Sequence, residues 1–430
     1  MVTYEDALKE VLYNIPVLEA EEKPLFKCAG QVLAEDIYPD CCFPQTDISG
    51  PDGYAVQSAD LKRAGRDRPV RLRIIGTVRA GRLPKRALSP GTAMRIMTGA
   101  VVPCGADCVV RFEDTDEPEN KNGPNPGNPK EVKIYVSVPS RGNIRPAGSS
   151  IEKGARLLPK GTVMGPAQIS TLASVGKSQV RVIRQPVVAV IATGDELIDL
   201  GRPLSPGKAY NCNTAAISSL ITYYGGKPKV LGIARDRKED LRAKISKGMD
   251  ADLIITSGGV SKGDYDLVRL VMDGMGKVIF SKIRMGPGAS VALGIVKDAS
   301  SGNGKESIPL FGLSGPPPGC LINFETLVRP ALLRMRGIQD IDHPVVEALA
   351  LDSVAGVMPM TFVRWTYLEK RNGQFYVRLN VADDVGILPC IATANSLTMI
   401  PPKGTSIREG DKISVWPLDW RRPQFLPAYL

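Results

Sequence analysis

ADLIITSGGVSKGDYD, residues 251–266, is the stretch that decides the fold. The aliphatic residues predict a buried strand, the glycines and serines predict a loop, and the acidic residues predict the beginning of a helix. A buried strand that ends in a small-residue loop is typical of ligand sites in open α/β sheets. Glycine lets the backbone approach a ligand closely, and a helix N-terminus favours an anion. The alternative interpretation is an ordinary loop with aspartates near a helix N-terminus.

The flanking sequence alternates between strand and helix patterns. The continuous apolar run at 187–192 is typical of a strand buried on both faces. Further strands are predicted at 229–234, 252–256, 277–284 and 308–313, and helices at 213–224, 237–247, 264–274 and 319–335. This alternation predicts a doubly wound parallel sheet.

Other parts of the chain show different sequence patterns. Residues 4–14 carry apolar positions at helical spacing and predict a first helix, and residues 166–176 predict another. Short β-branched runs interrupted by glycine and proline at 70–115 predict a small β domain. Short strands return after residue 343 and predict a compact β domain or barrel. The expected fold class is therefore a multidomain protein with α/β and β parts.

Composition narrows the classes of function. The 430 residues include 55 basic and 45 acidic ones, and we interpret the basic residues as dispersed. This favours acidic small molecules and gives no indication of nucleic acid. Since there is no long apolar run and no signal sequence, we expect no membrane segment and a cytoplasmic location. The single histidine, His343, makes histidine-based catalysis or zinc ligation unexpected, and the eight cysteines are expected to be reduced thiols.

Carboxylates follow several of the predicted strands. Thr193-Gly194-Asp195-Glu196 ends the first strand, Asp236 follows the second, and Asp264 and Asp266 follow the glycine loop. Because parallel strands present their carboxyl ends at one edge of the sheet, these side chains are expected to converge there. Carboxylates suit Mg²⁺, which accompanies phosphorylated ligands. Any one of these aspartates could be a helix cap, but capping explains the whole set at one edge of the sheet less well.

Ordered segments along almost the whole chain resemble one family. They are PDGYAV at 51–56, RIMTGA at 95–100, PCGAD at 103–107, GNIR at 142–145, TGDEL at 193–197, SGGVS at 257–261 and ANSL at 394–397. The chain is similar to the molybdopterin molybdotransferases, the molybdate insertases that include MoeA and the E domain of gephyrin.

The resemblance implies four domains in a homodimer. They are an N-terminal helical and linker domain at 1–44 and 141–180, an inserted β domain at 45–140, an α/β molybdopterin-binding domain at 181–336 and a C-terminal β barrel at 337–430. The site would lie between one subunit's α/β domain and the partner's inserted domain, so Asp52, Thr98 and Gly99 would act in trans. Contact with the molybdopterin adenylyltransferase is also implied.

The implied reaction is Mg²⁺-dependent insertion of molybdate into adenylylated molybdopterin with release of AMP. By similarity, Glu196, Asp236 and Asp266 are assigned to catalysis, and the same three residues with Asp264 to the metal. Substrate binding is assigned to Asp52, Thr98, Gly99, Arg145, Thr193, Gly194, Asp195, Ser257, Gly258, Gly259, Ser261, Lys282, Ser314 and Gly315.

The chain departs from the family pattern at three places. Gly286-Pro287-Gly288-Ala289-Ser290 replaces Lys-Pro-Gly-Lys-Pro, so two lysines are absent beside the expected anion site. Residues 313–319 read LSGPPPG instead of beginning Leu-Pro-Gly-Asn-Pro, and two serines at 149–150 replace an acidic pair. Four alternatives follow: a divergent insertase of the same activity, one that prefers another oxyanion such as tungstate, one that uses a different pterin form, or a scaffold that binds molybdopterin without turnover.

Overall fold

The computed structural model describes residues 1–117, 130–259, 267–297, 307–356, 358–382 and 386–418. The chain divides into two compact units, each with hydrophobic cores of its own. The α/β unit consists of Met1–Lys23, Cys28–Ala34 and Arg181–Leu430, and the β unit consists of Pro24–Lys27 and Glu35–Val180. The chain passes between them within β1 (Ala20–Pro24) and β9 (Gln179–Ile183), and also between residues 27 and 28 and between residues 34 and 35.

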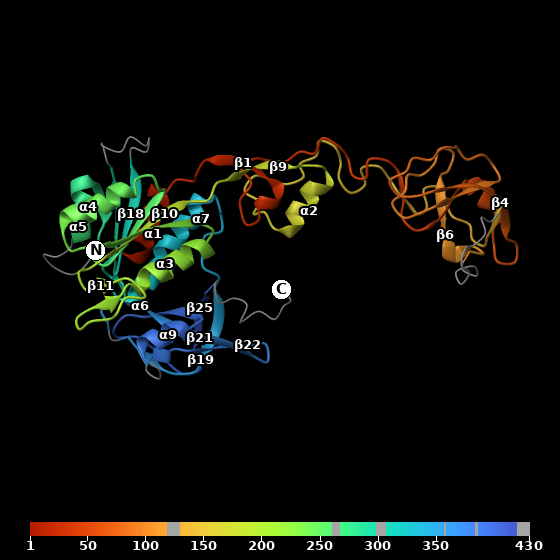
Figure 1. The fold of residues 1–430 in the computed structure, drawn as a ribbon. Coiled ribbons are helices and arrows are strands. Elements are labelled where there is room, and N and C mark those ends of the chain that lie inside the picture. Colours follow the sequence, from red (N-terminus) through yellow and green to blue (C-terminus); the bar gives the residue numbers. More distant parts are fainter. Residues whose placement is uncertain (118–129, 260–266, 298–306, 357, 383–385, 419–430) are drawn as a thin grey trace. The chain divides into compact units, whose positions relative to one another are not determined.

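A six-stranded sheet lies at the centre of the α/β unit (Figure 1). Its order is β13 (Lys227–Ala234), β10 (Val187–Thr193), β14 (Leu253–Ser257), β18 (Ile308–Leu313), β17 (Ala292–Val296) and β15 (Gly276–Phe280). The first four strands in this order pair in parallel. The prediction of a parallel sheet with alternating helices is thus confirmed for these strands, which carry the site.

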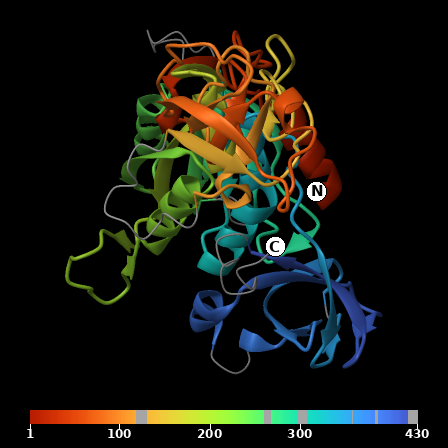
Figure 2. The same ribbon diagram turned by 90° about the vertical axis from the view of Figure 1, so that its right-hand side faces the viewer.

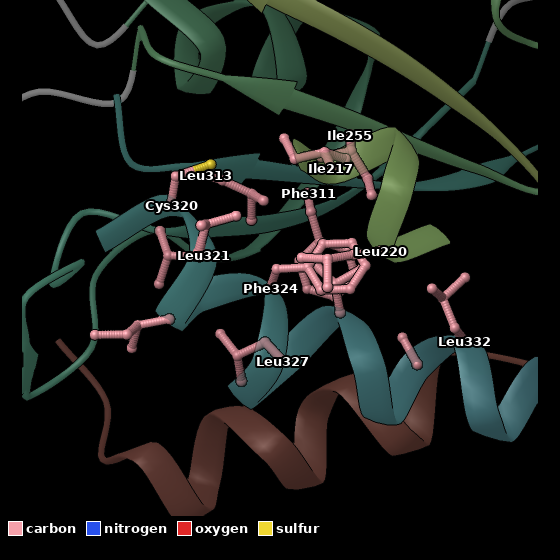
Figure 3. Packing of buried hydrophobic residues seen from close by; sticks show 14 of the residues in the cluster. Ile217, Leu220, Ile255, Phe311, Leu313, Cys320, Leu321, Phe324, Leu327 and Leu332 are labelled. Carbon is pink, nitrogen blue, oxygen red and sulfur yellow. The ribbon is translucent and has the colours of Figure 1, made fainter. Parts of the chain in front are cut away.

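Helices cover both faces of this sheet. Val188 and Val190 of β10 point into one core, and Ala189 and Ile191 point into the other, as the two-residue period of a strand requires. The first core lies against α1 (Tyr4–Asn14), α3 (Cys212–Tyr223) and the continuous helical segment α6 (Pro317–Asn323), η5 (Phe324–Val328) and α7 (Arg329–Met335) (Figure 3). The second core lies against α4 (Lys238–Lys247) and α5 (Leu267–Met275). No described helix is both long and apolar enough to span a membrane.

The far edge of the sheet differs from the sequence prediction. β17 pairs antiparallel with both β18 and β15, so the sheet is mixed. The strand predicted at 277–284 is a shorter edge strand, and β17 was not predicted. Antiparallel neighbours need no crossover helix, and the alternation of strand and helix therefore contains no signal for them.

The C-terminal part of the α/β unit is a closed five-stranded barrel, drawn in blue in Figure 2. Around the barrel, β21 (Thr361–Arg371) is followed by β22 (Gln374–Arg378), β19 (Val346–Ala350), β25 (Lys412–Pro417) and β23 (Ser396–Ile400), which pairs back with β21. The short strand β16 (Met285–Gly286) also pairs with β21 and so connects the part of the α/β unit that contains the six-stranded sheet to the barrel. Smaller elements here are β20 (Val354–Ala355), β24 (Ser406–Ile407) and α9 (Ile387–Thr393).

The β unit contains the small β domain that the sequence predicts. Its five-stranded sheet has the order β6 (Cys108–Arg111), β3 (Gly53–Val56), β5 (Thr92–Ile96), β4 (Val70–Val78) and β7 (Glu131–Ile134). A two-stranded ladder joins β2 (Ile48–Ser49) to β8 (Ile144–Arg145), and α2 spans Pro166–Ser174. Three short 3₁₀ turns lie at Leu25–Lys27, Ser58–Leu61 and Phe112–Asp114.

A buried ion pair fixes the N-terminal ends of the two central strands. Arg184, just before β10, donates two hydrogen bonds of 2.6 Å to the carboxylate of Asp252, just before β14. The same carboxylate accepts a 2.8 Å bond from the backbone N–H of Val187. These bonds raise the pKa of Arg184 above its ordinary value. The side chain of Asp252 is only 3% exposed, so its charge depends on these partners.

Replacing Asp252 with alanine is expected to lower the free energy of unfolding by about 3–5 kcal/mol, because it leaves the largely buried guanidinium of Arg184 with only the mostly exposed Glu19 as an ionic partner. Urea titration at neutral pH measures this. The matched control is Glu19→Gln, which removes a mostly exposed carboxylate from the same Arg184. The control should cost less than about 1 kcal/mol, and an equal cost for both variants would contradict the assignment.

Candidate functional site

A cavity of about 1180 Å³ opens at the carboxyl ends of the parallel strands. β10 comes first in the chain, the next strand (β13) lies on one side of it and the following strand (β14) lies on the other. The connections therefore change direction at β10, and such a switch point leaves a crevice at the carboxyl ends of the strands. The predicted site residues that line the cavity are Thr193, Gly194, Glu196, Asp236, Ser257, Gly258, Gly259, Ser314 and Gly315.

The glycine loop after β14 has a backbone that only glycine adopts easily. Gly258 and Gly259 have φ values of +91° and +69°. A Cβ atom on Gly258 would lie 2.7 Å from the carbonyl oxygen of Thr193. The N–H of Gly258 donates to the carbonyl of Leu313 at 3.0 Å, and the Thr193 hydroxyl donates to the carbonyl of Ser257 at 3.2 Å. These contacts hold the loop close against the ends of β10 and β18.

Two carboxylates line the cavity beside this loop. The carboxylate of Glu196 lies over Gly194, so close that a Cβ atom there would overlap it. Asp236 follows β13, and its Oδ2 accepts a 3.1 Å bond from the backbone N–H of Asp195. Among the described residues, no group of three acidic, cysteine or histidine side chains is arranged to hold a metal. The predicted ligands Asp264 and Asp266, like Ser261, lie outside the described residues.

Two predicted substrate-binding residues of the α/β unit do not line the cavity. Asp195 is exposed and lies outside the cavity lining, where its Oδ1 accepts a 3.4 Å bond from the backbone N–H of Asp236. Lys282 is half-buried and also lies outside the lining; its carbonyl accepts from the N–H of Val2 at 3.1 Å. The structure thus brings together most of the predicted residues of the α/β unit, but not these two.

Several residues that line the cavity were not predicted from the sequence. Lys238, the first residue of α4, is the only lysine or arginine among the described residues that line the cavity. Asn213 in the first turn of α3 donates a 2.8 Å bond to the carbonyl of Gly315. Asn211 caps that helix by accepting from the N–H of Thr214 at 3.3 Å. The sequence Asn211-Cys212-Asn213 before an apolar helix is an N-cap signal that could have located this edge.

Asn323 connects two of the three segments at which the chain departs from the family pattern, residues 286–290 and 313–319. Its side chain is fully buried. Its Oδ1 accepts a 3.2 Å bond from the N–H of Ser314, and its Nδ2 donates a 2.9 Å bond to the carbonyl of Gly288. Gly288 has φ +94°, and a Cβ atom on it would collide with the Asn323 amide. One buried amide therefore sets the distance between these loops, and its place inside a helix gave no signal in the sequence.

The remaining predicted residues form a cluster within the β unit. Asp52 accepts from the backbone N–H of Thr98 at 2.7 Å and from its hydroxyl at 2.9 Å. Gly99, with φ +76°, donates to the carbonyl of Ser49 at 2.9 Å. The exposed Arg145 lies opposite Ile48 in the adjacent ladder. These four residues share one exposed loop region, although they come from distant parts of the sequence.

The fold and the cavity define an α/β protein with a ligand site at the switch point of its parallel sheet. Residues 2–176 match the family model of the MoeA N-terminal region (domain I and II), and residues 189–334 match that of a probable molybdopterin binding domain. The molybdopterin molybdenumtransferase of Bacillus subtilis is 32% identical over 96% of this chain and 93% of its own length. The Nostoc enzyme of the same name is 31% identical over 94% of this chain and 91% of its own length.

Solved structures agree with these sequence matches. A molybdopterin biosynthesis MoeA protein from Pyrococcus horikoshii has a TM-score of 0.81 and 34% identity, and the alignment covers 97% of this chain and 99% of that one. A second MoeA structure from the same organism has a TM-score of 0.77 and 25% identity, with 97% and 100% covered. The chain belongs to the MoeA family of molybdopterin molybdenumtransferases. It is a transferase of molybdenum cofactor biosynthesis, as the resemblance implied.

Gly258→Ala is expected to lower the free energy of unfolding by about 2 kcal/mol, because alanine combines an unfavourable φ with a collision at Thr193. Urea titration measures the change. Gly274→Ala is the matched control, since a Cβ atom at this exposed position in α5 would meet open space and the backbone has no positive φ. The control should stabilise by about 0.5–1 kcal/mol. If Gly258→Ala were neutral, the loop would not have the close packing described above.

Proposed function

We propose that this chain inserts molybdate into adenylylated molybdopterin and releases AMP. The observation that carries the proposal is a single cavity lined by carboxylates at one part and by the glycine loop and Ser314-Gly315 at another. The substrate is an anionic pterin with a diphosphate bond, so it needs backbone donors near the phosphates and a counter-charge near the bond that breaks. Lys238 supplies one positive charge to the lining.

Mg²⁺ fits the donor set of this cavity. The carboxylates of Glu196 and Asp236 line it, and neither makes an ion pair with a described lysine or arginine. Carboxylate oxygens are the ligands that Mg²⁺ prefers. Glu196 and Asp236 would hold the ion with Asp264 and Asp266, and the bound ion would neutralise charge on the phosphate oxygens. The Asp195 N–H orients the Asp236 carboxylate, and Gly194 leaves room for that of Glu196.

The assembly also belongs to the proposal. By similarity to the family, two copies form a homodimer in the cytoplasm, and the Asp52–Thr98–Gly99 cluster of one copy completes the cavity of the other. The exposure of that cluster within its own unit supports this arrangement. Contact with the adenylyltransferase that makes the substrate would follow from the same reaction sequence.

The proposal is tested by AMP release from adenylylated molybdopterin with Mg²⁺ and either molybdate or tungstate. We expect release that depends on the oxyanion and stops on chelation of Mg²⁺. Glu196→Gln and Asp236→Asn should each lower kcat by about 10²–10³-fold, because a carboxylate that holds the metal or the transition-state charge is lost.

Glu239→Gln is the control for these variants, since Glu239 is an exposed carboxylate in the first turn of α4 that does not line the cavity. Tight pterin binding without release under either oxyanion would instead identify a scaffold. Better turnover with tungstate would support the tungstate-preferring alternative.

The absent lysines can be tested at one of their two positions. Gly286 in β16 is paired with Phe362 of the barrel, and a Cβ atom there would lie 3.0 Å from the Phe362 ring. A lysine at 286 would therefore disturb the contact with the barrel as well as add charge. Ala289 already carries a Cβ atom and is half-buried, and Ser290 beside it lines the cavity.

Ala289→Lys is expected to change the ratio of kcat/KM for molybdate and tungstate by about threefold or more, because an ammonium adds a charge-assisted donor to the oxyanion. Steady-state AMP release with each oxyanion measures the ratio. Ala289→Met is the control of similar length without charge. An unchanged ratio in the lysine variant would mean that the lost lysines do not determine the oxyanion.

A further inference from the structure

The formal charge of this protein is concentrated in one short segment. Residues 62–86 contain ten of its 55 basic residues and one of its 45 acidic residues. The segment therefore supplies +9 of the net charge of +10, and the rest of the chain is almost neutral. The interpretation of the basic residues as dispersed is wrong for this segment. The average composition of the chain does not explain this concentration of positive charge, so the segment requires a separate explanation.

The segment is centred on strand β4 of the β unit. Arg71 and Arg73 are exposed on one face of β4, and Leu72 between them points into the core. The loop before the strand and the loop after it supply the other charges, which are also exposed. A nine-residue strand is roughly 30 Å long. We call this set the basic strip: Lys62, Arg63, Arg66, Arg68, Arg71, Arg73, Arg79, Arg82, Lys85 and Arg86.

No ion pair compensates the charges of the basic strip within the described part of the protein, although Arg73 lies opposite Glu131 of β7 in the antiparallel ladder. None of the ten side chains makes an ion pair or a side-chain hydrogen bond with a described acidic residue. Arg71 lies directly opposite Lys133 of β7 in the antiparallel ladder. Like charges at such positions destabilise a sheet. An acidic ligand on this face would remove that repulsion.

The composition of the strip favours a protein as that ligand. Eight of the ten basic residues are arginines, which bind carboxylates in a bidentate manner and are enriched in protein interfaces, whereas lysine is depleted. Leu83 lies between Arg82 and Lys85 and is 77% exposed, and so offers an apolar contact amid the charge. Residues 62–86 contain no Phe, Tyr or Trp, and therefore lack the stacking platform typical of single-stranded nucleic acid binding.

We propose that the basic strip is a docking surface for a protein partner that presents clustered carboxylates beside an apolar side chain. Charge complementarity selects this occupant, and Leu83 supplies the short-range contact that charge alone does not provide. Such a surface increases the rate of encounter and orients the partner. The proposal concerns a face of the β unit and does not depend on the oxyanion used by the enzyme.

The test uses the full chain and a fluorescent 15-residue peptide of repeated Glu-Glu-Leu, with binding followed by anisotropy at physiological ionic strength. The triple variant Arg71→Gln, Arg73→Gln and Arg82→Gln should bind the peptide about tenfold more weakly, because three charge-assisted contacts are lost. Leu83→Ser should also weaken peptide binding. It should leave binding of a DNA duplex unchanged, because phosphate contacts need no apolar side chain.

The matched control removes three exposed charges from the α/β unit through Lys9→Gln, Arg242→Gln and Lys247→Gln, and should bind like the unmodified chain. Four results would overturn the proposal. The first is no saturable binding of the peptide, and the second is an equal loss of binding in both triple variants. The third is tighter binding of the DNA duplex than of the peptide. The fourth is a sedimentation coefficient that changes only in the Arg71, Arg73 and Arg82 variant, which would assign the basic strip to self-association.

Discussion

The burial of β10 on both faces is the constraint on which the α/β unit depends. Its side chains alternate between two hydrophobic cores, and its backbone pairs in parallel with a strand on each side. Parallel pairs require crossover connections, and the two strands that follow β10 in this part of the sheet lie on opposite sides of it. The crevice at the end of β10 is a consequence of this topology. The ion pair between Arg184 and Asp252 secures the opposite ends of the same strands.

The cavity is shaped by backbone geometry and buried hydrogen bonds more than by charge. Gly258 has to be glycine because the Thr193 carbonyl lies where a side chain would begin. Asn323 holds two loops at a fixed separation with a single amide, and Asn213 attaches α3 to one of them. Buried hydrogen bonds of this kind rigidify a site. A rigid frame is what a transferase needs to hold its reactants in alignment.

Much of the fold could be predicted from the sequence because its signals are local. The apolar run of β10, the boundaries of β18 and the helix at Tyr4–Asn14 agree with the predictions. The antiparallel edge could not be predicted, since β17 itself was not recognised as a strand and its pairing with β18 and β15 needs no crossover helix. The closure of the barrel depends on the pairing of β21 with β23, whose residues are well separated in sequence. Pairing between strands that are far apart in the sequence leaves no periodic pattern from which it could be predicted.

The sequence by itself determined the residue types of the site: glycines where the backbone approaches closely, carboxylates after the strands and a family pattern along the chain. Only the tertiary structure decided which of them share the cavity. It placed Glu196 and Asp236 in the lining, left Asp195 and Lys282 outside it, and added Lys238 and Asn213. The physical reason is that a residue's type reflects its local chemistry and backbone, whereas its neighbours are set by the packing of strands and helices that lie far apart in the chain.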